Sequence, residues 1–172
     1  MQASYVAAME VLHRLCMFVA GVCLVVITLI IPWGVFTRYV LNYGSSWPEP
    51  LAVLLMIWFS FTAAALCYRE GLHISVRILP SMLQGWRRLL LGWTAELAMA
   101  GINLFMLIWG VRLVHTTWFQ AISDFPAISV GISYLPVPIG GAITLLFVIE
   151  RLWTGRLFQE PAAAELAPVG VE

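Results

Sequence analysis

Four long stretches of the chain are apolar and nearly free of charge, and most charged residues lie outside them. An α-helix rises about 1.5 Å per residue, so roughly 20 residues cross the ~30 Å hydrocarbon core of a bilayer. The first stretch, from Leu15 to Thr37, has no charged residue and is long enough to cross. The pattern predicts four transmembrane helices, over residues 15–37, 48–68, 89–111 and 137–153.

Proline, glycine and charged residues mark the ends of these spans. Pro48 suits the first turn of the second span. Glu49 beside it can interact with the positive end of the helix or pair with an Arg such as Arg38. Gly71 follows the last residues of that span and is expected to close the helix. Pro136 and Pro138 indicate that the fourth helix starts near Pro138, because proline is tolerated in a first turn and disfavoured further inside a helix.

The composition places these helices in a membrane. Of the 172 residues, 62% are hydrophobic and only 10% are charged, and the mean hydropathy is +0.92, which is too apolar for a water-soluble domain of this size. We therefore expect an all-α integral membrane protein with a four-helix domain over residues 1–157. Residues 158–172 are rich in Ala, Pro and Glu and are predicted to form a disordered tail. The net charge is zero and no basic run occurs, so we expect no nucleic-acid partner.

All nine basic residues are arginines, and their distribution predicts the orientation. Loops on the cytoplasmic side of a membrane carry an excess of Lys and Arg. With four alternating spans, the two termini share the side that holds seven of the nine arginines, so both termini are predicted to be cytoplasmic. Arg14, Arg69, Arg77, Arg87, Arg88, Arg151 and Arg156 lie on that side, whereas Arg38 and Arg112 lie on the other.

Glu96 is the only charged residue inside the third span, about 12 Å along the helix from Arg88. An ionised carboxylate at that depth costs a few kcal/mol, so Glu96 should face protein, pair with a cation or be protonated. Asn103 lies on the same helix face. These residues could form a proton or ion relay, or a polar contact that holds helices together. We favour the contact, because a relay needs several ionisable groups at matching depth and no other span supplies one.

The histidines raise the alternative of a b-type cytochrome-like electron-transfer subunit, because small membrane subunits can hold haem between histidines on facing helices. His13 and His73 lie near the predicted cytoplasmic ends of spans and His115 near the opposite end, so their depths do not match. We therefore expect no cofactor. The chain has no phosphate-binding glycine loop, HExxH motif or nucleophile elbow, and we do not expect an enzyme.

Short motifs with a definite order flank the second span. An R-Y-x-x-N element runs from Arg38 to Asn42, a W-x-E element joins Trp47 to Glu49, and a G-x-H-I-x-V element begins at Gly71 and includes His73. An L-P-x-P-I-G element opens the fourth span. In this order the motifs resemble those of the DctQ-like small membrane subunit of tripartite ATP-independent periplasmic (TRAP) transporters. The chain departs from the family pattern at Pro50 and Arg77, where many members carry acidic residues.

The resemblance implies a multi-pass subunit of a bacterial inner membrane. Such a subunit enlarges the scaffold of a large permease, which imports a small organic acid delivered by a periplasmic binding protein, using an ion gradient. We expect no substrate site in this chain, because four spans lack the repeats and broken helices of a midplane site. A self-sufficient homo-oligomeric transporter is the remaining alternative. The motif residues are candidates for partner contact or for ordering the loops: Arg38, Asn42, Trp47, Glu49, Gly71 and His73.

Overall fold

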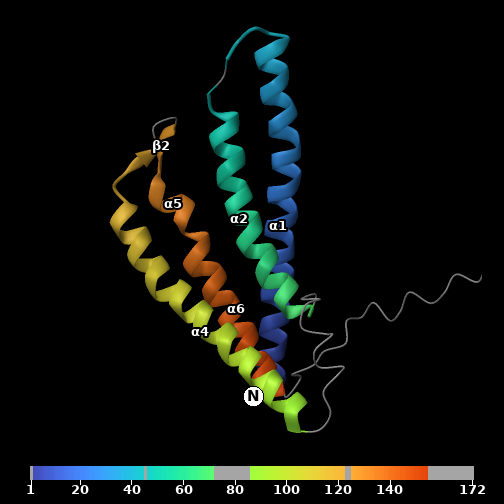
Figure 1. The fold of residues 1–172 in the computed structure, drawn as a ribbon. Coiled ribbons are helices and arrows are strands. Elements are labelled where there is room, and N and C mark those ends of the chain that lie inside the picture. Colours follow the sequence, from blue (N-terminus) through green and yellow to red (C-terminus); the bar gives the residue numbers. More distant parts are fainter. Residues whose placement is uncertain (1, 45, 72–85, 123–124, 155–172) are drawn as a thin grey trace, which may run out of the picture.

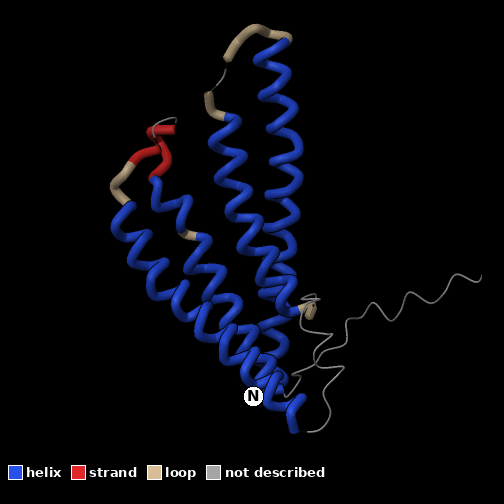
Figure 2. Tube along the Cα trace, viewed as in Figure 1, coloured by secondary structure: helices blue, strands red, loops and turns tan. Residues whose placement is uncertain are grey.

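The computed structural model describes residues 2–44, 46–71, 86–122 and 125–154, and most of that length is helical (Figures 1 and 2). Each of the four predicted spans lies within one long helix. The predicted tail, residues 158–172, lies outside the described residues. The helices are α1 (Gln2–Tyr39), α2 (Pro48–Arg69), α4 (Trp86–Thr117), the short α5 (Val130–Tyr134) and α6 (Pro136–Thr154).

Two of the helices extend well beyond their predicted spans. α1 begins at Gln2 rather than near residue 15, and α4 continues to Thr117 rather than ending near residue 111. The absence of charge identifies the apolar part of each helix. The helix itself is longer, because backbone hydrogen bonding continues through polar turns beyond the apolar part. α6 begins at Pro136, because the N–H groups of a first turn have no intrahelical partner and proline removes nothing there.

The four long helices alternate in direction and form two pairs (Figure 1). α1 packs along α2, α4 packs along α6, and contacts between α2 and α6 join the pairs. We call the end where α1 and α4 begin and α2 and α6 end the charged end. The two pairs lie close together there and diverge toward the opposite end, as Figure 2 also shows.

The opposite end, which we call the hairpin end, carries a small antiparallel ribbon. β1 (Ala121–Ile122) pairs with β2 (Phe125–Ser129), with Ala121 opposite Ser129. Ser129 then caps α5, because its side chain accepts a hydrogen bond from the N–H of Gly131 at 3.1 Å. The chain thus reverses direction after α4 and enters α6 through α5.

The buried core lies where all four long helices meet. Met9 of α1, Ala65 and Tyr68 of α2, and Phe147 and Val148 of α6 form its centre, and Met99 and Ala100 of α4 pack against it. Away from this core the helices are largely uncovered. In the apolar part of α4, only 11% of an 18-residue stretch is buried. The described residues therefore include four long helices that can cross a membrane, with most of their apolar surface available to lipid or to a partner.

A close approach between α4 and α6 depends on a glycine. A Cβ atom at Gly110 would lie 2.9 Å from Cδ of Pro138 and 3.1 Å from its backbone nitrogen. Small residues at helix crossings let backbones approach closely in membranes, where packing replaces the hydrophobic effect as the driving force. Gly110 thus allows α4 and α6 to stay in contact toward the hairpin end.

Candidate functional site

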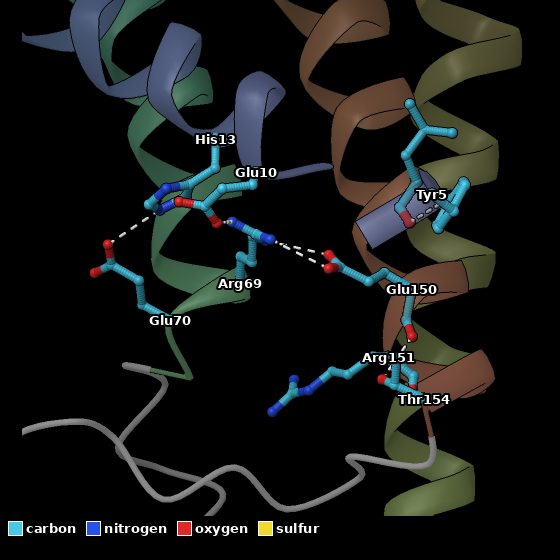
Figure 3. Close-up of polar contacts among 9 residues, drawn as sticks. Tyr5, Glu10, His13, Arg69, Glu70, Glu150, Arg151 and Thr154 are labelled. Atoms are coloured by element: carbon cyan, nitrogen blue, oxygen red, sulfur yellow. Dashed lines mark hydrogen bonds and ion pairs between the residues drawn. The ribbon is translucent and has the colours of Figure 1, made fainter. Parts of the chain in front are cut away.

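Charged and polar side chains from α1, α2 and α6 gather at the charged end, and Arg69 is at the centre of this network (Figure 3). The Nε and Nη2 atoms of Arg69 each donate to an oxygen of Glu150 at 3.1 Å, which makes a bidentate pair between α2 and α6. Its Nη1 atom donates to Glu10 of α1 at 3.0 Å. The side chains of Arg69 and Glu150 are only 17% and 13% exposed, so dissolved salt screens their attraction only weakly.

Glu96 links the remaining helix to the network. It is buried, accepts a hydrogen bond from the hydroxyl of Tyr68 on α2, and lies 3.3 Å from Nη1 of Arg151 on α6. The guanidinium of Arg151 also lies over the Tyr68 ring, 5.2 Å from its centroid. The expectation that no other span supplies an ionisable group at the depth of Glu96 is therefore wrong. Of the states expected for Glu96, the geometry is that of a carboxylate facing protein and paired with a cation.

The N-terminal part of α1 is held at the same end by side chains at the edge of the network. His13 lies 3.2 Å from a carboxylate oxygen of Glu70, so its ring nitrogen is engaged with a neighbouring helix. The hydroxyl of Tyr5 donates to the carbonyl of Leu146 at 3.0 Å, and its ring packs against Trp153. These contacts explain why α1 remains helical and packed before its apolar span begins.

Asn103 behaves differently from Glu96. Its side chain is buried, and its amide nitrogen donates to the carbonyl of Met99 at 2.8 Å, within its own helix. Such a bond satisfies a buried donor without joining two helices. The interhelix role predicted for Asn103 remains a prediction.

The motif residues after the first span lie at the hairpin end. Arg38 and Glu49 form the ion pair that the sequence suggested, with 3.6 Å between Nη2 and Oε2, and their side chains are 58% and 80% exposed. Asn42 adopts a left-handed backbone with φ of 52°, which Asn tolerates better than most residues, and so shapes the turn that follows α1. Trp47 immediately precedes Pro48 at the start of α2. Arg38 and Glu49 thus stay accessible to a partner.

The end of α2 requires a glycine. Gly71 has φ of 68°, a conformation that glycine adopts without steric cost, and its N–H donates to the carbonyl of Tyr68 at 3.2 Å. The predicted role of Gly71 in closing the second helix is confirmed by this geometry. His73 lies outside the described residues, so its role stays a prediction.

Sequence reasoning missed the centre of the network. Glu10 and Glu150 were not singled out, and Arg69 and Arg151 were interpreted only as markers of orientation. A signal was present, because acidic residues and arginines occur together at the same predicted end of the first, second and fourth spans. Charges that serve orientation alone need no acidic partners nearby.

The fold and the network define a four-span helical membrane protein in which charged side chains join the helices to one another. Comparison with known sequences identifies the family of this membrane protein. The sequence profile of the DctQ component of tripartite ATP-independent periplasmic transporters matches residues 27–157, and the chain belongs to this family.

Two relatives carry matching descriptions. A TRAP transporter small permease protein of Haemophilus influenzae is 27% identical over 135 residues, which cover 75% of this chain and 80% of that protein. The sialic acid TRAP transporter small permease protein SiaQ of Vibrio cholerae is 24% identical over 128 residues, covering 72% of this chain and 71% of that protein. The chain is thus a small permease subunit of a TRAP transporter and a multi-pass protein of the inner membrane.

Proposed function

We propose that this chain is a non-enzymatic brace for the large permease subunit of a transporter that imports a small organic acid delivered by a periplasmic binding protein. The observation that carries the proposal is the network at the charged end. Glu96, Arg151, Arg69 and Glu150 are engaged with one another or with neighbouring helices, so their charges hold the bundle together. Side chains used in this way are suited to stiffening a scaffold.

The proposed substrate class is supported by the family and by one relative. SiaQ is named for sialic acid, which is an organic acid. The substrate of this chain's transporter is proposed only as a small organic acid, captured outside the membrane and moved by the large subunit with an ion gradient.

The charged end is proposed to face the cytoplasm. Arg14, Arg69 and Arg151 belong to that end, whereas Arg38 and Arg112 belong to the hairpin end, in keeping with an excess of Arg on the cytoplasmic side. In this orientation both ends of the chain lie in the cytoplasm, and the β1–β2 ribbon faces the periplasm.

The hairpin end is then the side on which partners meet the motif residues. Arg38, Asn42, Trp47 and Glu49 lie on or between the ends of α1 and α2, and the Arg38–Glu49 pair is largely exposed. An exposed pair contributes little to the stability of its own chain, so its charges remain available for a partner. We propose that these residues contact the large permease or the docked binding protein, and that Gly71 and His73 shape the cytoplasmic end.

Variants of the exposed pair test this function. Glu49→Gln and Arg38→Ala are co-expressed with the large permease and the binding protein, and the permease recovered with the tagged chain is measured together with uptake of labelled sialic acid and other small organic acids. Arg112→Ala is the control, because Arg112 lies at the same end but outside the motif, over the ring of Trp109. We expect both motif variants to lower recovery and uptake and the control to leave them unchanged. Normal assembly and normal uptake in the motif variants would contradict the contact.

A further inference from the structure

A groove of about 680 Å³ opens at the hairpin end, between the two helix pairs. Its walls come from α2 on one side and from β1 and α5 on the other. Leu54 and Ile57 of α2 and Val130 of α5 line its apolar part, whereas Arg38 and Glu49 lie at its rim. The groove therefore lies where the pairs diverge in Figures 1 and 2.

The divergence follows from where the pairs are joined. α2 and α6 are in contact at Phe61 and Gly140, because an added Cβ on the glycine would lie 3.1 Å from Cβ of Phe61. They are also in contact at the charged end, through Arg69 and Glu150. Toward the hairpin end beyond Phe61, α2 borders the groove and contacts the short α5. α2 and α6 both end at the charged end, away from the groove.

The chemistry of the groove favours an occupant that is apolar along its length and polar at one end. The rim pair uses one nitrogen of Arg38 and one oxygen of Glu49 at 3.6 Å, which leaves further donors and an acceptor for another molecule. The terminus of a transmembrane helix has unpaired backbone N–H or C=O groups that can bond to such side chains. Helices associate in lipid through packing against a shaped surface and through hydrogen bonds, and a helix provides both, whereas a lipid tail resembles the surrounding bilayer.

We propose that this groove receives a transmembrane helix of the large permease, with the end of that helix against Arg38 and Glu49. The inference rests on the proposed function, since it names the surface through which the brace holds its partner. The incoming helix lies along the open side of the groove, because α2 and α5 are already in contact, and it covers the apolar residues Leu54 and Ile57. The charged end, where the pairs are joined, fixes the width of the groove.

Photo-crosslinking tests the contact directly. A photoreactive phenylalanine derivative replaces Leu54 or Ile57 in the tagged chain, which is co-expressed with the large permease and irradiated in membranes. Val111 is the control position, because it lies on α4 a similar distance from the hairpin end and is 54% exposed, outside the groove. We expect at least fivefold more crosslinking to the permease from positions 54 and 57 than from 111. Equal or weaker crosslinking from the groove positions would overturn the proposal.

Filling the groove gives an independent measurement. Ile57→Trp is expected to reduce the permease recovered with the chain at least fivefold, and Val111→Trp is expected to leave it unchanged, provided that both variants melt like the wild type. If Ile57→Trp is unstable, the crosslinking ratio alone decides. Crosslinks from position 54 or 57 to phospholipid, with the permease still bound to the chain, would assign the groove to a lipid and overturn the proposal. If the wild-type chain does not bind the permease, the proposed function itself fails.

Discussion

The two ends of the bundle use charged residues in opposite ways. At the charged end, Arg69 and Glu150 are shielded and bonded through two nitrogens, whereas at the hairpin end Arg38 and Glu49 meet through one long contact and remain mostly exposed. The Arg69–Glu150 ion pair joins the two helix pairs, and the Arg38–Glu49 ion pair lies on the rim of an open groove. The difference indicates that one end holds this chain together and the other is available to a partner.

The largest expected effect comes from removing the central cation of the charged end. Arg69→Ala leaves Glu150 shielded and without its bidentate partner, and breaking a buried pair in this way typically costs 3–5 kcal/mol. Because Arg69 is partly accessible, we expect a loss of about 3 kcal/mol in the free energy of unfolding, measured by denaturant titration of the purified chain in detergent. Arg14→Ala is the control, since Arg14 is 77% exposed and should change stability by less than about 0.5 kcal/mol. Equal effects of the two variants would remove the distinction between shielded and exposed arginines.

A smaller effect is expected at Glu96. Glu96→Gln removes the charge that faces Arg151 but retains an oxygen for the Tyr68 hydroxyl, so we expect a loss of about 2 kcal/mol in the free energy of unfolding. A double-mutant cycle with Arg151→Gln separates the pair from other effects. Coupling between the two sites should lie near 1–2 kcal/mol, and additive losses would show that Glu96 and Arg151 do not act together.

Packing between α4 and α6 should have a further, more modest effect. Gly110→Ala places a Cβ against the ring and backbone of Pro138, and overpacking of this kind costs about 1–2 kcal/mol. Gly101→Ala is a matched control on the same helix, because an added Cβ there meets nothing within 4 Å. The control should be neutral or slightly stabilising, since alanine favours helix over glycine. Thermal melts of both variants provide the comparison, and equal melting temperatures would argue against a tight crossing at Gly110.

The smallest change in stability is expected at the hairpin end. Arg38→Ala removes one exposed ion pair, so the free energy of unfolding of the isolated chain should change by less than about 0.5 kcal/mol. The same variant should lower the amount of permease recovered with the chain. A large loss of stability in the isolated chain would mean that the hairpin end holds the fold together as the charged end does.

The sequence predicted four long apolar helices, because about twenty apolar residues with almost no charge have few alternatives to a membrane helix. It also suggested the Arg38–Glu49 pair as one of two roles for Glu49, and it predicted that Gly71 closes the second helix. Both features depend on residues close to helix ends and to their own motif, so rules for spans and helix ends can predict them.

The network at the charged end could not be predicted in the same way. Arg69 and Glu150 are separated by 81 residues, and their contact depends on how α2 packs against α6. Glu96 was recognised as a residue in need of a partner, but its partners Tyr68 and Arg151 come from two other helices. The divergence of the helix pairs, and hence the groove, likewise follows from packing that no single segment encodes.

The most direct test of the account is whether this chain forms a stable complex with the large permease. The tagged chain is co-expressed with the permease, extracted in mild detergent and analysed by size-exclusion chromatography. We predict that the two proteins elute together, that Arg69→Ala lowers the yield of folded chain, and that Arg38→Ala releases the permease from a chain that remains folded. Elution of the wild-type chain by itself, apart from the permease, would contradict the account.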